Sequence, residues 1–247
     1  MKGTINVQAE NIFPIIKKFL YSDHEIFLRE LVSNAVDATT KIKTLSRLGE
    51  FKGEVGNTNI EVKIDAANGT LHIIDKGIGM TAEEVEKYLN QVAFSGATEF
   101  LKEYEGKADD AGIIGHFGLG FYSAFMVSKK VEVLTKSWKD GSAVKWTCDG
   151  SPNYELEEIE KTERGTEIIL FIDEESKEFL EEARVEGILT KYCKFLPAAI
   201  KFGTKTIKED DPSGEKDEND NVKQVDVEVD KIITNRKPIW KKSPTAV

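Results

Sequence analysis

The feature that most constrains this chain is a long helical segment between residues 25 and 48 that carries two opposed stripes. Apolar residues recur at spacings of three and four, which predicts an amphipathic helix with one face on a core. This apolar stripe consists of Phe27 or Leu28, Leu31, Val32, Ala35, Ile42 and Leu45. Ser22 and Glu25 have capping-box spacing and Gly49 is a stop signal, so we expect the helix to end near Leu48.

The second stripe of this helix is polar and could face a ligand. Glu30, Asn34 and Asp37 stand at positions i, i+4 and i+7, which lie on one face of a helix. Small residues surround the stripe: Ser33, Ala35 and Ala38. An ordinary solvated face is the alternative, but the small neighbours leave room for a ligand. An asparagine carbonyl suits Mg²⁺ beside phosphates, and a carboxylate one turn away can deprotonate a water.

An aspartate–glycine turn follows a predicted hairpin. Alternation over residues 60–64 and 71–74, with Asn68-Gly69 between them, predicts two antiparallel strands. The second strand runs into Asp75-Lys76-Gly77-Ile78-Gly79-Met80, where two spaced glycines permit a backbone bend. A carboxylate only accepts hydrogen bonds, so Asp75 suits an exocyclic amine such as that of adenine. A plain turn capped by Asp75 is the alternative.

A glycine-rich loop is the third candidate site element. Residues 112–120 contain four glycines and lead into a helix-like apolar run from Phe121 to Val127. That composition is typical of a loop that holds phosphates before a helix, although a flexible loop is the alternative. The segment lacks the GxxxxGK[ST] pattern, and Ser123 stands where GxGxxG needs its third glycine.

Arg164-Gly165-Thr166 enters a predicted strand at residues 166–172. The Thr166 hydroxyl could bond a ligand beside Asp75, or the tripeptide could be a plain strand start.

The remaining pattern predicts an α+β fold with a mixed, largely antiparallel sheet and helices on one face. Thr81 and Glu84 form a capping box that opens a helix to about Val92, while residues 93–122 are poor in regular signals. Further helices are expected at 9–21 and 174–196, and further strands at 130–135, 143–148, 154–159, 199–207 and 222–230. The acidic segment 209–221 is expected to form the mobile tip of a hairpin, with an interdomain linker as the alternative.

The composition of the chain argues against several classes of partner and site. The 247 residues carry a net charge of −10, which argues against a nucleic-acid partner. Cys148 and Cys193 have no CxxC neighbour, so a reducing compartment without a disulfide is expected, and the three histidines show no metal spacing. No stretch reaches the roughly 18 apolar residues of a membrane span, and the N-terminus lacks an apolar signal core. We therefore expect a cytoplasmic protein with no membrane partner.

The order of these motifs resembles a known ATPase superfamily. ExxSNxxDA on a helix, then DxGxGM, GxxGxFGxGFYS and GT, is similar to the ATPases of gyrase, heat-shock protein 90, histidine kinases and MutL. Residues 27–38 and 115–123 look like the N-terminal nucleotide-binding domain of the heat-shock protein 90 family, in its bacterial cytosolic form. The resemblance runs from about residue 4 to the end, and Lys237-Pro238-Ile239-Trp240 resembles the connection to that family's middle domain.

This resemblance implies a two-layer α/β sandwich, the Bergerat-type fold, which binds ATP with Mg²⁺. It implies that Glu30 is the general base, that Asn34 holds Mg²⁺ and the phosphates, and that Asp75 accepts the adenine amine with Thr166 beside it. The full set of implied nucleotide contacts is Asn34, Asp37, Ala38, Asp75, Gly79, Met80, Gly115, Phe117, Gly118, Leu119, Gly120, Phe121 and Thr166. Residues near 91–121 would be a lid, residues 1–235 the nucleotide-binding domain, and residues 236–247 the start of the connection to a middle domain absent here.

The resemblance also implies a function. It is that of an ATP-dependent chaperone of the heat-shock type, acting in the stress response on unfolded or partly folded client proteins. The full-length protein would be a homodimer and this domain alone a monomer. The family's catalytic arginine comes from its middle domain, so we expect good nucleotide binding and very slow hydrolysis.

Some residues depart from the family pattern. Residues 93–98 lack two lysines found in many relatives and carry Phe94, Ala97 and Thr98, while His116 replaces a glutamine. Nucleotide affinity or lid closure can therefore differ. Two other functions remain open from the sequence: a binding-only module switched by nucleotide, and a kinase that passes phosphate to a histidine.

Overall fold

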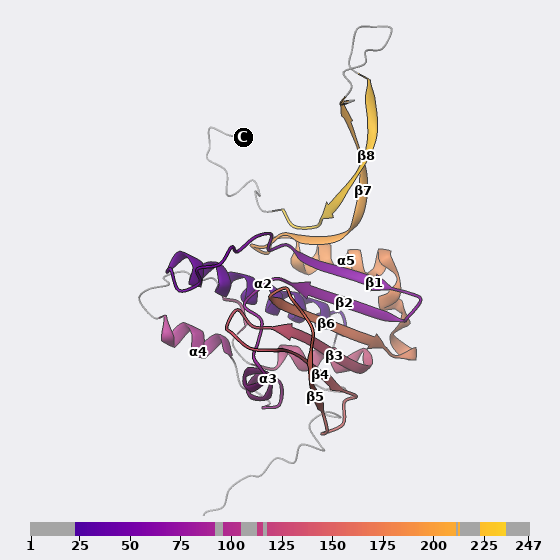
Figure 1. Cartoon of the computed structure of the whole chain (residues 1–247). Coiled ribbons are helices and arrows are strands. Elements are labelled where there is room, and N and C mark those ends of the chain that lie inside the picture. The colour runs from indigo at the N-terminus through magenta and orange to yellow at the C-terminus, as the bar shows by residue number, and fades with distance from the viewer. Residues whose placement is uncertain are drawn as a thin grey trace, which may run out of the picture.

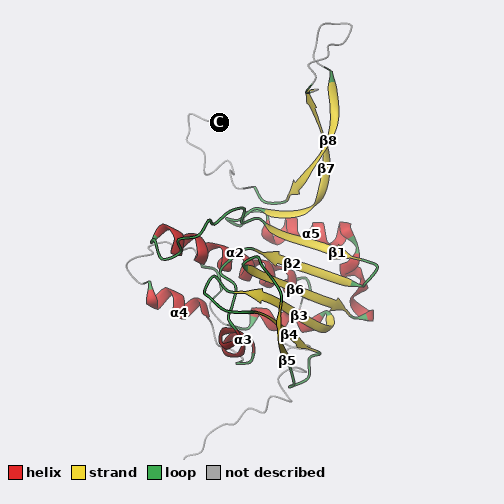
Figure 2. Cartoon of the chain, viewed as in Figure 1, coloured by secondary structure: helices red, strands yellow, loops and turns green. Residues whose placement is uncertain are grey.

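A computed structural model describes residues 23–91, 96–104, 113–115, 118–210, 212 and 223–235 (Figure 1). Within these residues, eight strands form one sheet in the order β5-β4-β3-β6-β2-β1-β7-β8. Neighbouring strands pair antiparallel except β1 and β7, which are parallel. Helices α2 and α5 pack together on one face of this sheet (Figure 2). The predicted α+β class with a mixed, largely antiparallel sheet is confirmed.

The strands follow the sequence pattern closely. Gly69 takes a φ of 65° in the turn between β1 and β2, which confirms the predicted hairpin. The bounds are β1 Ile60–Asp65, β2 Thr70–Asp75, β3 Ser128–Lys136, β4 Ala143–Cys148, β5 Glu155–Ile159, β6 Gly165–Ile172, β7 Ile200–Asp210 and β8 Gln224–Ile232.

Helix α2 (Ile26–Arg47) is the central helix of the fold. All members of its predicted apolar stripe are buried, and Gly49 ends it with a φ of 76°. The predicted capping box of Ser22 and Glu25 is not tested, because Ser22 lies outside the described residues; helix α2 begins directly after Glu25. The Glu25 carboxylate binds Arg184 Nη1 at 2.5 Å and Lys191 Nζ at 2.7 Å. Both partners belong to α5 (Glu182–Cys193), so these ion pairs join the two helices.

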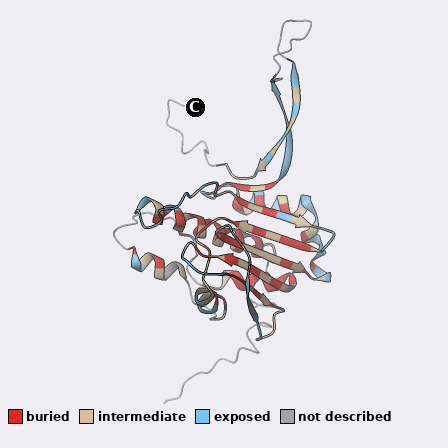
Figure 3. Cartoon of the chain, viewed as in Figure 1, coloured by how far each residue is buried: buried red, intermediate tan, exposed pale blue. Residues whose placement is uncertain are grey.

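The core lies between the sheet and these helices. Val62 and Leu71 from the sheet and Phe27 and Leu31 from α2 belong to one buried cluster. Figure 3 shows buried stretches, in red, along both the strands and the helices of the body. A smaller cluster joins the other end of α2 to helix α4 (Gly96–Glu103) and to Ile113. Together the two clusters hold α2 along its whole length, which positions the polar stripe.

The helices depart from the sequence prediction at several points. The predicted helix 174–196 is broken at Glu181, whose φ of −90° and ψ of 124° separate the 3₁₀ helix η3 (Glu174–Leu180) from α5. Helix α3 (Ala82–Leu89) ends three residues before the predicted Val92. Helix α4 was not predicted, because residues 93–122 show few signals of regular structure in the sequence. The run after the glycine loop is the 3₁₀ helix η2 (Gly120–Met126).

Strands β7 and β8 pair antiparallel, as predicted for a hairpin, and project from the body as a ribbon (Figure 1). Most of the acidic segment between them lies outside the described residues, as do the predicted helix 9–21 and the residues from 236 onward. Cys148 and Cys193 are both buried and unpaired, as expected. Over the described ranges, no helix is both long and apolar enough to cross a membrane.

Candidate functional site

One cavity of about 890 Å³ collects the residues singled out by the sequence. Its walls come from α2, the ends of β2 and β6, helices α3 and α4, and the glycine-rich loop. Every predicted site residue that the structure describes lines it: Glu30, Asn34, Asp37, Ala38, Asp75, Gly79, Met80, Gly115, Gly118, Leu119, Gly120, Phe121 and Thr166. Phe117 and the departures Phe94 and His116 lie outside the described residues, as do the side chains of Ala97 and Thr98.

The acidic residues of the α2 stripe have different partners. Arg29 donates to Glu30 Oε1 from Nε at 3.0 Å and from Nη2 at 2.5 Å. Asp37 is 5% exposed, and its two oxygens accept the backbone N–H groups of Ile114 and Gly115, each at 2.8 Å. Asp37 therefore ties the glycine-rich loop to α2, a role that the sequence reasoning did not assign.

The loop approaches the stripe so closely that side chains would be crowded there. A Cβ on Gly120 would lie 2.8 Å from Glu30 Oε2, and one on Gly115 would lie 3.1 Å from Asp37 Oδ2 and 3.6 Å from Asn34 Oδ1. Gly118 has a φ of 64°, which favours glycine. The glycines thus bring backbone next to the amide and the acids, as a phosphate-binding loop requires.

Asp75 is a buried carboxyl group at the end of β2. It is 7% exposed, and its Oδ1 accepts the Gly77 N–H at 2.7 Å. Burial raises the pKa of the Asp75 carboxyl to about 7, although backbone donors at Gly77 and Thr166 and the nearby Lys161 and Arg164 oppose this. Near neutral pH the group is therefore poised between its acid and its carboxylate, and a hydrogen-bond donor in the cavity would favour the carboxylate.

The glycines of the turn are required by packing. A Cβ on Gly77 would lie 2.5 Å from the Ala38 backbone carbon, and one on Gly79 would lie 1.8 Å from the Lys136 carbonyl oxygen. Gly79 also has a φ of 61°. Backbone bonds fix the same segment, since Ile78 N donates to Ala38 O at 3.1 Å. The turn is therefore held between α2 and the end of β3.

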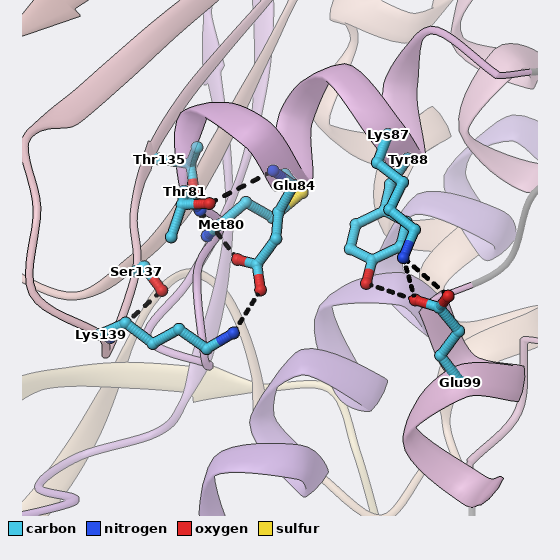
Figure 4. Close-up of polar contacts among 9 residues, drawn as sticks. All are labelled: Met80, Thr81, Glu84, Lys87, Tyr88, Glu99, Thr135, Ser137 and Lys139. Atoms are coloured by element: carbon cyan, nitrogen blue, oxygen red, sulfur yellow. Dashed lines mark hydrogen bonds and ion pairs between the residues drawn. The ribbon is translucent and has the colours of Figure 1, made fainter. Parts of the chain in front are cut away.

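Three polar side chains stand in one row across the sheet. Asp75 on β2 is opposite Thr166 on β6, and Thr166 is opposite Thr135 on β3. Thr135 Oγ1 lies 2.9 Å from Thr166 Oγ1. It also accepts the Met80 N–H at 3.0 Å (Figure 4). Thr135 is fully buried, and sequence reasoning missed it because it carries no motif and reads as an ordinary strand residue.

Helices α3 and α4 form another part of the cavity wall. The predicted capping box of α3 is confirmed, with Thr81 Oγ1 accepting the Glu84 N–H and Glu84 Oε2 accepting the Thr81 N–H (Figure 4). Glu99 of α4 binds Lys87 Nζ at 2.7 and 2.8 Å and the Tyr88 hydroxyl at 2.9 Å. These contacts bridge α3 and α4 at the cavity.

Lys41 is a cavity cation that the sequence analysis overlooked. It stands one turn beyond Asp37 on α2 and lines the cavity. Burial lowers the pKa of the Lys41 ammonium, while the Asp37 and Glu84 carboxylates act in the opposite direction. Its i+4 spacing from Asp37 was the signal that could have revealed it.

This geometry agrees with the comparisons to known proteins. Residues 21–177 match the family described as "Histidine kinase-, DNA gyrase B-, and HSP90-like ATPase". The chain belongs to this family, and its fold and motifs are those of an ATPase domain of the class. Family membership implies a nucleotide ligand.

Particular relatives narrow the similarity to one kind of chaperone. The chain is 58% identical over 245 residues to chaperone protein HtpG of Bacteroides fragilis strain YCH46, covering 99% of this chain and 34% of the relative. It is 56% identical to chaperone protein HtpG of Porphyromonas gingivalis strain W83, covering 98% and 34%. The HtpG of Shewanella amazonensis is 43% identical over 85% of this chain. The chain spans about a third of the length of these relatives, and the resemblance to heat-shock protein 90 is confirmed.

Proposed function

We propose that this chain is the N-terminal nucleotide-binding domain of an ATP-dependent chaperone, and that it binds ATP with Mg²⁺ and hydrolyses it slowly. The observation that carries the proposal is that Asp75, at the end of β2, lines one cavity with Glu30 and Asn34, which stand far before it in the sequence on α2. Its volume of about 890 Å³ is in the range of small-molecule sites.

The Asp75 end of the cavity suits adenine. A buried carboxylate that accepts backbone N–H groups still retains acceptor capacity for an exocyclic amine, because its two oxygens have about four lone-pair sites. Thr166 stands opposite, and Gly79 and Met80 complete the wall with backbone and apolar surface. We assign Asp75 as the acceptor of the adenine amine, with Thr166 beside it.

The α2 stripe and the glycine loop suit the phosphates. Asn34 Oδ1 faces the Gly115 backbone, so an amide oxygen is available where the loop approaches. Mg²⁺ usually takes one or two protein ligands and otherwise waters and phosphate oxygens. We assign Asn34 as the Mg²⁺ ligand, and the ion would supply charge neutralisation at the phosphates.

Glu30 is assigned as the general base. Arg29 binds its Oε1, which orients the carboxylate and leaves Oε2 toward Gly120 in the cavity wall. Oε2 can then accept a proton from a water that attacks the terminal phosphate. A second cation at that phosphate, in addition to Mg²⁺, would come from another part of the full protein, so slow turnover is expected here.

The wider role rests on the relatives, whose names describe them as chaperones. We propose that the full-length protein is a cytoplasmic homodimer that acts on unfolded or partly folded client proteins, and that this domain alone is a monomer. Residues 1–235 would form the nucleotide-binding domain with a lid near 91–121, and residues 236–247 would begin the connection to a middle domain.

Calorimetric titration with ADP, with and without Mg²⁺, tests the pocket. Asp75→Asn keeps the shape but replaces the carboxylate by a neutral amide. Loss of a charge-assisted hydrogen bond of about 1.5–3 kcal/mol should weaken ADP binding roughly 10- to 150-fold. Glu158→Gln, an exposed change on β5, is the matched control and should bind normally. Equal ADP affinity in Asp75→Asn and the wild type would show that Asp75 does not bind the nucleotide.

A hydrolysis assay tests the enzyme assignment. Glu30→Ala should keep ATP affinity and lose the slow release of phosphate, because binding and proton transfer use different groups. If the chain were only a binding module switched by nucleotide, Glu30→Ala would change neither its ATP affinity nor any release of phosphate. Transfer of the labelled γ-phosphate to a protein histidine would instead indicate the kinase function.

A further inference from the structure

Arg164 stands directly before β6, and its guanidinium donates hydrogen bonds to three backbone carbonyls. Its Nε donates to Gly77 O at 2.8 Å and to Lys76 O at 3.3 Å. Its Nη2 donates to Lys76 O and to Val55 O, each at 3.0 Å. All three acceptors are main-chain carbonyls, so this guanidinium binds backbone and no carboxylate by hydrogen bond in the described structure.

The same guanidinium is held from a second direction by an aromatic ring. Its central carbon lies 4.9 Å from the centroid of the Phe51 ring. Phe51 and Val55 belong to the segment that follows α2, and both pack against the small hydrophobic cluster at that end of the helix. Arg164 therefore joins three segments: the chain after α2, the turn after β2, and the start of β6.

Gly165 places this arginine next to the aspartate turn. A Cβ at residue 165 would lie 2.1 Å from the Asp75 carbonyl oxygen and 2.7 Å from the Lys76 Cα, and the φ of Gly165 is 118°. The backbone of β6 can thus approach the turn only at a glycine. The tripeptide 164–166 consequently has three tasks, since Arg164 holds the turn, Gly165 permits the approach and Thr166 faces Asp75.

We propose that Arg164 is a positioning residue for adenine recognition, which holds the 76–77 carbonyls so that Asp75 presents its carboxylate to the base. Arg164 is absent from the described residues that line the cavity, so it acts through Asp75 and the turn. This inference rests on the proposed function, because it presumes that Asp75 accepts the adenine amine.

Lysine cannot reproduce this arrangement. The planar fork of arginine directs several N–H donors at fixed angles and stacks on an aromatic face, whereas a lysine ammonium is a compact point charge on a flexible stem. Arg164→Lys keeps the charge near Asp75 but loses the geometry that holds two adjacent carbonyls. The substitution therefore tests the effect of the position of Asp75 while a positive charge remains near its carboxylate.

The test compares ADP with inosine diphosphate, whose base carries a carbonyl oxygen in place of the adenine amine. Both dissociation constants are measured by calorimetry. The wild type should prefer ADP by about tenfold or more, because adenine presents a donor amine at the position where inosine presents a carbonyl oxygen that cannot donate to Asp75. In Arg164→Lys, ADP affinity should fall about five- to tenfold while inosine diphosphate affinity stays within about twofold. The ratio of the two affinities is the diagnostic readout, since a general loss of structure lowers both.

A matched control is available on α5. Arg184 is also an arginine against a phenylalanine ring, 5.6 Å from the Phe179 centroid, and it binds Glu25 and Glu178. Arg184→Lys should leave the ADP preference unchanged. Phe51→Leu removes the ring under Arg164, and should lower the ADP preference to a smaller extent.

The outcomes are distinguishable. No ADP preference in the wild type would contradict the assignment of Asp75 in the proposed function. A wild-type preference that survives intact in Arg164→Lys, or a parallel loss of both affinities, would overturn the role of Arg164. If Arg164→Lys does not fold, Phe51→Leu decides, and an unchanged preference in that variant overturns the proposal.

Discussion

Asp75 and Thr166 face each other across the antiparallel pair β2–β6, with exposures of only 7% and 8%. Thr135 on β3 continues the row and bonds Thr166. The end of the sheet thus holds a carboxyl and two hydroxyls in fixed register, because cross-strand neighbours are set by the pairing of the strands. A ligand that enters the cavity meets Asp75 and Thr166 beside the polar stripe of α2, while the fully buried Thr135 supports Thr166 from behind.

The pH dependence of nucleotide binding should report on Asp75. Its pKa is raised by burial to about 7, and its carboxylate is the better acceptor for the adenine amine. ADP affinity should therefore rise as pH increases from about 6 to 8, by up to about tenfold, and level off above. Calorimetry in Asp75→Asn is the control, since titration of the ADP phosphates is common to both proteins. An identical pH profile in the variant would contradict the assignment.

The same pKa has an opposite consequence for the stability of the ligand-free fold. The Asp75 carboxyl titrates at 3.8 in an ordinary setting and at about 7 in the fold, so the folded chain binds this proton more tightly than the unfolded chain. Its contribution to stability is fully present below 3.8 and is lost as pH rises through about 7. Asp75→Asn should thus gain stability relative to the wild type between pH 5 and 8, measured by urea unfolding. A constant difference across that range would show that burial does not control this group.

Asp37 should control the order of the glycine loop. Its carboxylate accepts two backbone N–H groups from residues 114 and 115, and in Asp37→Ala both donors lose their partner. A hydrogen bond to a charged group is worth about 1.5–3 kcal/mol, so without these bonds the Ile114 and Gly115 amides should exchange with deuterium roughly tenfold or more faster. Asp65→Asn changes an exposed aspartate that accepts from Asn68 in the β1–β2 turn, and should leave these amides unaffected. Equal protection in Asp37→Ala would mean that the loop is held by other contacts.

Two glycine substitutions should have contrasting effects. A Cβ at residue 120 would lie 2.8 Å from Glu30 Oε2, the far end of a side chain that can shift, whereas a Cβ at Gly187 of α5 would meet nothing within 4 Å. Gly120→Ala should thus displace the Glu30 carboxylate and slow phosphate release with nearly normal ADP affinity. Gly187→Ala should raise the free energy of unfolding by about 0.5–1 kcal/mol and leave phosphate release unchanged. A wild-type rate of hydrolysis in Gly120→Ala would show that Glu30 Oε2 does not accept the proton.

The strands and the polar stripe were predictable because each depends on local periodicity. The apolar residues of α2 and the alternation in β1 and β2 specify their elements without reference to distant residues. The Thr81 capping box was predictable for the same reason, since its hydrogen bonds span three residues.

The unpredicted features depend on distant contacts. Helix α4 contains Gly96 at its start, and it is held by Phe100 and Tyr104 against Ile42 and Leu45 of α2. The partners of Asp37 lie 77 and 78 residues away in the chain. Glu25 has the spacing of a local capping box, and its carboxylate binds Arg184, 159 residues away. Local patterns cannot reveal which distant partners a side chain takes.

The bridge between α3 and α4 leads to a last prediction about the cavity wall. Glu99 accepts from Lys87 and from the Tyr88 hydroxyl, and the Lys87 ammonium holds the pKa of Glu99 below its ordinary value. Because Lys87 and Glu99 are each 42% exposed, Glu99→Gln should cost less than about 1 kcal/mol in global stability. Its effect should appear locally, as faster deuterium exchange over residues 99–104, where few other polar contacts hold α4. Glu103→Gln, an exposed change on the same helix, should leave exchange unchanged. Exchange in α4 that is the same in Glu99→Gln and the wild type would show that the helix is held by the contacts of Phe100 and Tyr104, including the hydrogen bond from the Tyr104 hydroxyl to Glu50, and not by Glu99.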